Sequence, residues 1–113
     1  MARLSTHVLD TSRGCPAAGV VVDLHVRGEA ERRQLKTAAT DANGRLVLAE
    51  DLPSGVYELT FHAGRYFRAA GVGLADPPFL DEVVIRFGAA DSSENYHVPL
   101  LLSPYGYSVY RGS

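Results

Sequence analysis

The chain has 113 residues, of which 46% are apolar and 21% are charged, and its formal net charge is −2. A chain of this length is expected to form one domain with a single core, and its composition is that of an ordinary globular protein rather than a disordered tail. Because the lysines and arginines form no cluster, the charge pattern argues against nucleic acid and against a membrane surface as partners.

Three features of the sequence bear on the cellular compartment of the protein. Cys15 is the only cysteine, which excludes an intrachain disulfide and fits a reducing compartment. The segment 1–9 lacks the basic start and apolar run of a signal peptide, and no stretch approaches the ~20 apolar residues of a membrane helix. These features predict a cytoplasmic protein.

Apolar and polar residues alternate along much of the chain, which is the pattern of strands with one buried face. In the segment 19–27, apolar residues occupy every second position, whereas Asp23 and His25 lie between them. Eight strands are predicted, near residues 3–9, 19–27, 33–39, 45–49, 55–62, 82–88, 95–102 and 105–112.

Turn-forming residues separate these strands. Asn43-Gly44 is the pair best suited to the positive φ of a hairpin turn, and proline-containing turns precede the fifth and sixth strands. Residues 64–70 are compatible with a short helix that ends before Gly71. The pattern therefore predicts an all-β fold, a two-sheet, eight-stranded antiparallel sandwich with one short helix, in a single domain spanning residues 1–113.

Four histidines are candidates for acid–base chemistry, because the ordinary pKa of imidazole, about 6.5, lies close to neutral pH. His25 and His62 lie on polar strand faces, and we expect both to be solvated surface residues. His7 and His97 each lie within a predicted strand. Taken singly, a strand histidine is more often structural than catalytic.

The last segment of the sequence is unusual. Residues 103–113 form a strand-like run with three tyrosines that ends in Arg-Gly-Ser. Aromatic residues in such a position indicate a segment held in place by packing, although an ordinary edge strand explains them equally well.

Three separated blocks together resemble the transthyretin-like 5-hydroxyisourate hydrolases. They are Leu4–Gly19, Thr40–Arg45 and Tyr96–Ser113, and the strands between them match in spacing. The most specific mark of the family is the tetrapeptide Tyr110–Ser113. Vertebrate transthyretin, the hormone carrier of the same fold, lacks that ending.

The resemblance implies an enzyme that opens the ring of 5-hydroxyisourate in urate degradation and yields 2-oxo-4-hydroxy-4-carboxy-5-ureidoimidazoline. It places catalytic groups at His7, Arg45, His97 and Ser113, and it makes Tyr110, His7 and Arg45 substrate contacts. It implies a homotetramer, built as a dimer of dimers with its sites along a central channel. The resemblance implies neither a cofactor nor a metal ion.

These residue types suit the addition of water to a ring carbonyl. A positioned histidine base accelerates such a step by about 10²–10⁴-fold, provided that its imidazole is neutral. The charge of Arg45 would lower the pKa of a nearby histidine, and its guanidinium would donate to the carbonyl oxygen as negative charge develops. Which histidine is the base stays open. A serine nucleophile is disfavoured because no Gly-x-Ser-x-Gly pattern occurs, and zinc is disfavoured because no ligand spacing fits it.

The apolar residues near the last strands exceed what one small core needs, which predicts a subunit interface. They are Leu100, Leu101, Leu102, Tyr105 and Tyr107.

Two other readings are open at this point. The segment 40–61 resembles the hairpin of carboxypeptidase-regulatory-like and collagen-adhesin-type surface modules. A carrier like transthyretin would use the same intersubunit channel without chemistry. A channel lined by histidines and arginine suits a small oxypurine better than a large apolar hormone.

Overall fold

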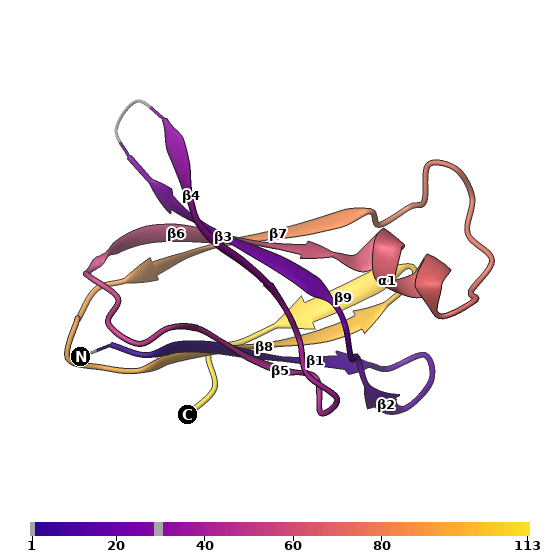
Figure 1. Cartoon of the computed structure of the whole chain (residues 1–113), viewed down its shortest axis with the longest axis horizontal. Helices are drawn as coiled ribbons and strands as arrows, with labels where there is room; N and C mark the ends of the chain where they lie inside the picture. The colour runs from indigo at the N-terminus through magenta and orange to yellow at the C-terminus, as the bar shows by residue number, and fades with distance from the viewer. Residues whose placement is uncertain (1, 29–30) are drawn as a thin grey trace.

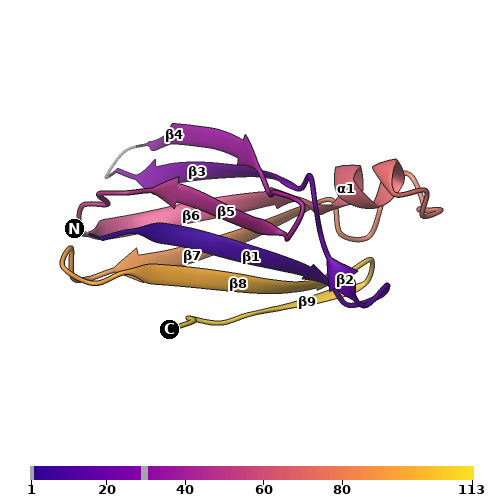
Figure 2. The same cartoon turned by 60° about the horizontal axis from the view of Figure 1, so that its bottom comes forward.

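The structure is a computed structural model that describes residues 2–28 and 31–113, so residues 1, 29 and 30 of the predicted domain lie outside the described residues. Two β-sheets face one another, and a short helix lies at one end of the pair (Figure 1 and Figure 2). The elements are β1 (Leu4–Asp10), β2 (Cys15–Pro16), β3 (Val21–Arg27), β4 (Arg32–Ala39), β5 (Arg45–Ala49), β6 (Gly55–His62), α1 (Ala63–Ala69), β7 (Glu82–Ala89), β8 (Tyr96–Ser103) and β9 (Gly106–Val109).

The predicted two-sheet sandwich with one short helix is confirmed. One sheet has the order β2-β1-β8-β9, with β5 also paired to β1, and the other has the order β4-β3-β6-β7. Among the described strands, β1 and β8 pair in parallel and the other neighbours pair antiparallel. The short strand β2, which pairs with the end of β1, was not predicted, because two residues carry no periodic pattern.

The core lies between the sheets and follows the alternation of the sequence. Along β1, Leu4 and Val8 are fully buried, whereas Ser5 and His7 are half-buried on the outer face. Leu100 and Leu102 were predicted to contribute to a subunit interface, and that prediction is wrong because both side chains are fully buried in the core of the single chain. An excess of apolar residues does not reveal which of them points inward.

The last predicted strand, 105–112, is shorter in the structure. It ends at Val109, and an isolated bridge between His97 and Gly112 continues the pairing further on. The interruption lies opposite Pro99, which has no N–H to donate and only accepts a long bond, 3.4 Å, from the amide of Tyr110.

The outer face of the sheet β4-β3-β6-β7 is less exposed to solvent than the alternation of apolar and polar residues alone indicates. His25, predicted to be solvated, is only 8% exposed, so that prediction is wrong. Its cross-strand neighbour Glu58 accepts hydrogen bonds from the guanidinium groups of Arg27, Arg32 and Arg86, so three long side chains gather on this face. His62 is half-buried and hydrogen-bonded to Asp23 at 2.8 Å rather than solvated.

A buried carboxylate ties the first sheet to the helix. Asp10 is fully buried and accepts hydrogen bonds from the Ser12 hydroxyl (2.6 Å), from Nε of Arg13 (2.9 Å) and from the Tyr66 hydroxyl on α1 (2.9 Å). Burial alone would raise the pKa of Asp10, but these hydrogen bonds outweigh it and hold the pKa below its ordinary value. No helix among the described residues is long and apolar enough to cross a membrane.

We expect Asp10→Ala to lower the free energy of unfolding by about 2–4 kcal/mol, because it leaves the buried Tyr66 hydroxyl without its acceptor and breaks the link between β1 and α1. Chemical denaturation at fixed protein concentration measures the change. Asp91→Ala is the matched control, because Asp91 makes a similar turn with Ser93 at an exposed position and should cost much less. Equal losses for the two variants would contradict the role assigned to the buried network.

Candidate active site

Strand β1 has functional neighbours on both of its edges. In the ladder with β8, Ser5 lies opposite His97, and in the ladder with β5, His7 lies opposite Arg45. Because side chains alternate between the two faces of a strand, Ser5 and His7 share the outer face of the sheet. The pairing therefore gathers residues from three distant parts of the sequence on one surface.

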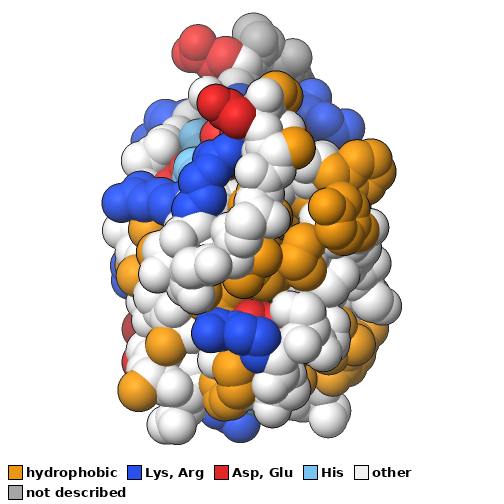
Figure 3. Space-filling model, turned by 90° about the vertical axis from the view of Figure 1, so that its right-hand side faces the viewer, with side chains coloured by type: hydrophobic (Ala, Val, Ile, Leu, Met, Phe, Trp, Pro, Cys, Tyr) orange, Lys and Arg blue, Asp and Glu red, His pale blue; other side chains and the backbone are white. Residues whose placement is uncertain are grey.

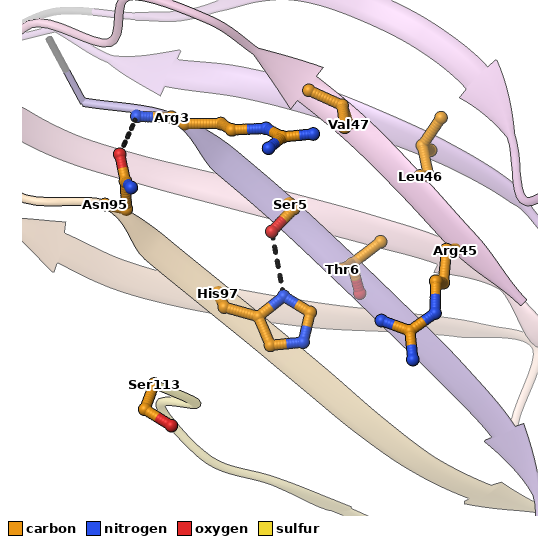
Figure 4. Close-up of a pocket in the computed structure, with 9 residues that line it drawn as sticks. All are labelled: Arg3, Ser5, Thr6, Arg45, Leu46, Val47, Asn95, His97 and Ser113. Carbon is orange, nitrogen blue, oxygen red and sulfur yellow. Dashed lines mark hydrogen bonds between the residues drawn. The ribbon is translucent and has the colours of Figure 1, made fainter.

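A hollow of about 350 Å³ opens on this surface (Figure 4). It is lined by Arg3, Ser5, Thr6, Arg45, Leu46, Val47, Asn95, His97 and Ser113. Three of the predicted site residues, Arg45, His97 and Ser113, therefore meet in one place within a single chain.

His97 is held on two sides within this hollow. Its Nδ1 is hydrogen-bonded to the hydroxyl of Ser5 at 2.8 Å, and its carbonyl oxygen accepts the amide of Gly112 at 2.7 Å. A Cβ at position 112 would lie 2.6 Å from Cδ2 of the His97 ring, so only glycine allows the last segment to lie against the imidazole. The ring is thereby fixed between β1 and the segment that follows β9.

The electrostatics of the site favour a neutral His97. Burial lowers the pKa of His97, the neighbouring charges of His7 and Arg45 lower it further, and together they outweigh a hydrogen bond with the Ser5 backbone that raises it. A neutral imidazole keeps a nitrogen lone pair, so this residue is available as a base at neutral pH.

The turn before β5 orients Arg45. Gly44 has a φ of 76°, as expected for the Asn-Gly pair, and its carbonyl accepts the amide of Val8 at 2.8 Å, which docks the turn on β1. The carboxylate of Asp41 accepts the backbone amides of Asn43 and Arg45, both at 2.9 Å. Hydrogen bonding from the Arg45 amide is the main reason that the pKa of Asp41 lies below its ordinary value.

His7 lies beside the hollow and is not part of its lining. Its Nε2 is 3.0 Å from the carbonyl oxygen of Asn43. A carbonyl oxygen only accepts hydrogen bonds, so Nε2 carries a proton and a neutral His7 keeps its lone pair on Nδ1. His7 therefore fastens the turn that leads into Arg45, while its charge contributes to the lowered pKa of His97.

Tyr110 is not brought to the same place. It is 56% exposed and borders a different hollow, of about 250 Å³, between β7 and the β8–β9 hairpin. Within one chain, the structure thus separates this predicted substrate contact from Arg45 and His97.

Six residues of the lining were not predicted as site residues, among them the polar residues Ser5, Asn95 and Arg3. Ser5 and Asn95 share strand faces with His7 and His97, so alternation contained a signal for both. Arg3 precedes β1 and had no such signal; its amide donates to the Asn95 side chain at 3.0 Å.

The groups in the hollow suit a small polar ligand rich in carbonyl oxygens. Arg3 and Arg45 supply fixed positive charge and planar sets of donors, and His97 supplies a base. Among residues 2–28 and 31–113, no group of three or more His, Cys, Asp or Glu side chains is placed to hold a metal ion.

Comparison with known proteins gives relatives over the whole chain. A protein named 5-hydroxyisourate hydrolase 2 from Rhizobium meliloti is 55% identical over 116 residues, covering 98% of this chain and 96% of the relative. The solved 5-hydroxyisourate hydrolase of Klebsiella pneumoniae superposes with a TM-score of 0.84 at 38% identity, and both chains are covered completely. The transthyretin of Sparus aurata superposes with a TM-score of 0.86 at 28% identity, with 96% of this chain and 95% of that chain covered.

The model of the HIUase/Transthyretin family matches residues 4–112. This match spans β1 to the segment after β9, and so it includes every strand that lines the hollow. The chain belongs to the HIUase/Transthyretin family.

Proposed function

We propose that this chain is a 5-hydroxyisourate hydrolase that opens the substrate ring to 2-oxo-4-hydroxy-4-carboxy-5-ureidoimidazoline in urate degradation. The observation that carries the proposal is the meeting of Arg45 and His97 in one hollow, in a chain 55% identical to a relative of that name. The test is the ultraviolet decay of freshly generated 5-hydroxyisourate with and without the protein. Decay at the spontaneous rate in the presence of folded protein would refute the proposal.

The chemistry begins with a water molecule beside His97. The neutral imidazole takes a proton as the water oxygen bonds to the ring carbonyl carbon, and Arg45 donates hydrogen bonds to the oxygen that becomes negative. The adjacent C–N bond then breaks, and the departing nitrogen receives the proton that His97 took from the water, which returns the imidazole to its neutral form. The product carries a new carboxylate, which the positive charges of Arg3 and Arg45 would stabilise.

His7 and Ser113 support this centre. His7 holds the turn of Arg45, and the Ser113 side chain at the edge of the hollow contacts the substrate. No covalent intermediate is required, because no serine in the hollow has both an adjacent base and a carboxylate that orients that base.

A carrier function is the alternative that the likeness to transthyretin raises. The lining of the hollow argues against it, because two arginines, a histidine and an asparagine there would have to be desolvated by an apolar ligand. Turnover in the decay assay distinguishes the enzyme from the carrier.

We propose that the single domain of residues 1–113 assembles into a homotetramer, a dimer of dimers, in the cytoplasm. Exposed aromatic residues support assembly: Phe79 is 74% and Tyr105 is 73% exposed, and their rings pack at a centroid distance of 6.1 Å. Hydrophobic side chains gather on one side of the end that carries α1 (Figure 3). In a tetramer, Tyr110 would reach substrate only through the approach of another subunit, because it lies away from the hollow of its own chain.

Arg45→Ala and His97→Ala should each lower kcat/KM in the decay assay by at least about 10²-fold, because each removes a group that acts in the transition state. His7→Ala and deletion of Gly112 and Ser113 should also lower turnover, since they release the Arg45 turn and the edge of the hollow. Arg68→Ala, which removes an exposed arginine from α1, is the matched control and should retain full activity. Full activity in any site variant would remove its assigned role.

The pH profile of kcat/KM should have an acidic limb whose midpoint lies below 6.5, the ordinary value for histidine. Burial and the charges of His7 and Arg45 lower the pKa of His97, so the base stays unprotonated to lower pH and activity is lost only as the pH falls through that lowered value. Initial rates between pH 4.5 and 8 in constant-ionic-strength buffers measure the limb. A midpoint above 6.5 would contradict a neutral His97 as the base.

Sedimentation equilibrium should give a mass near four times 12.2 kDa. Phe79→Ser and Tyr105→Ser should weaken the assembly, because each removes exposed aromatic area. Leu35→Ser is the control, since Leu35 is an exposed apolar residue on β4 and is not part of the Phe79–Tyr105 pair. A fully active wild-type monomer would refute the tetramer proposal.

A further inference from the structure

The hydroxyl of Ser5 is placed to decide which nitrogen of His97 carries the proton. Ser5 lies directly opposite His97 in the parallel ladder of β1 and β8, and its Oγ is 2.8 Å from Nδ1 of the imidazole. A neutral imidazole has one proton, on either Nδ1 or Nε2, and only the nitrogen without it is able to act as a base. The partner of Nδ1 therefore controls what Nε2 is able to do.

The surroundings of the ring determine the direction of this hydrogen bond. The ring lies between Ser5 and Arg45, with Nδ1 toward Ser5 and the edge that carries Cε1 and Nε2 on the side of the guanidinium (Figure 4). A guanidinium has donors and positive charge but no acceptor, so it favours a lone pair rather than an N–H on the nitrogen that faces it. The proton consequently belongs on Nδ1, and Nδ1–H donates to the hydroxyl oxygen of Ser5.

The opposite edge of the ring is closed by backbone. Cδ2 of His97 packs so closely against Gly112 that a Cβ there would lie 2.6 Å away. A flipped ring would lose the Ser5 hydrogen bond and direct Nδ1 toward this backbone instead. Ser5 and Gly112 thus hold one orientation of the imidazole.

We propose that Ser5 is a positioning residue that accepts the Nδ1 proton of His97 and so keeps the Nε2 lone pair facing the substrate water. Its catalytic meaning rests on the proposed function, whereas its effect on the imidazole is a property of the protein without ligand. The charged and titratable groups that face His97 are Arg45 from β5, His7 from β1 and, across the hollow, Arg3.

The tautomer is read directly by long-range proton–nitrogen correlation spectra of the histidine rings in ¹⁵N-labelled protein, recorded above the pKa of His97. The wild type should show His97 with a protonated Nδ1 and an unprotonated Nε2. Ser5→Ala should show a mixture of the two tautomers, and Ser5→Thr, which restores a hydroxyl at a strand position, should return the wild-type pattern. A protonated Nε2 in the wild type, or an unchanged tautomer in Ser5→Ala, would overturn the proposal.

Kinetics give an independent readout that a merely structural role would not produce. Ser5→Ala should lower kcat at least about tenfold and change KM by less than about threefold, because a base in the wrong tautomer loses most of its 10²–10⁴-fold contribution while binding persists. Ser5→Thr should recover most of kcat. Ser54→Ala, the same substitution at an exposed loop position, should behave as the wild type.

The acidic limb of the pH profile shows which partner donates in the hydrogen bond between Ser5 and Nδ1 of His97. If Ser5 accepts from Nδ1–H, the protonated imidazole loses a partner in Ser5→Ala, and the limb moves to lower pH. If Ser5 instead donates to Nδ1, the neutral imidazole loses a partner and the limb moves to higher pH, which would overturn the proposal. A wild type without hydrolase activity would refute the proposed function, and the nitrogen spectra would still decide the role of Ser5.

Discussion

The site depends on the pairing of β1 with two different strands in fixed register. β8 runs parallel to β1 along its whole length, and β5 runs antiparallel along its first half. Ser5 meets His97 across 92 positions of sequence on one edge, while His7 meets Arg45 on the other. A slip of one residue in either ladder would turn one of these side chains to the opposite face.

The register of β1 is fixed by the residues on its inward face, which point away from the candidate active site. Leu4 and Val8 are buried in the core, and Asp10 anchors the end of the strand to Arg13 and to Tyr66 on α1. These inward contacts oppose a change of register. A slip of one residue would expose apolar side chains to water and leave a buried carboxylate without its donors. The same alternation therefore stabilises the sandwich on one side and presents the polar groups on the other.

Much of the fold was predictable, because strand alternation and turn chemistry are local properties. Residues 45–49 and 55–62 were predicted as the structure has them, and Gly44 has the predicted positive φ. The hairpin predicted at Asn43-Gly44 is wrong, because the turn joins β4 and β5, which lie in different sheets. The burial of His25 was not predictable, since alternation identifies a face but not the three arginine side chains that gather on the neighbouring Glu58. Residues of the site were identified through family resemblance, and their meeting depends on a parallel pairing that no local pattern encodes. The position of Arg3 in the lining and the separation of Tyr110 from the hollow likewise depend on the three-dimensional arrangement of the strands.

The central physical claim is that this pairing sets a guanidinium against a histidine and keeps the imidazole neutral. Its most direct test is a proton NMR titration of the His97 ring in ligand-free protein, in the wild type and in Arg45→Ala. The account predicts a pKa below 6.5 in the wild type and a higher pKa in the variant, because one neighbouring positive charge has been removed. An identical pKa in both proteins would show that Arg45 does not act on His97, and would contradict the account.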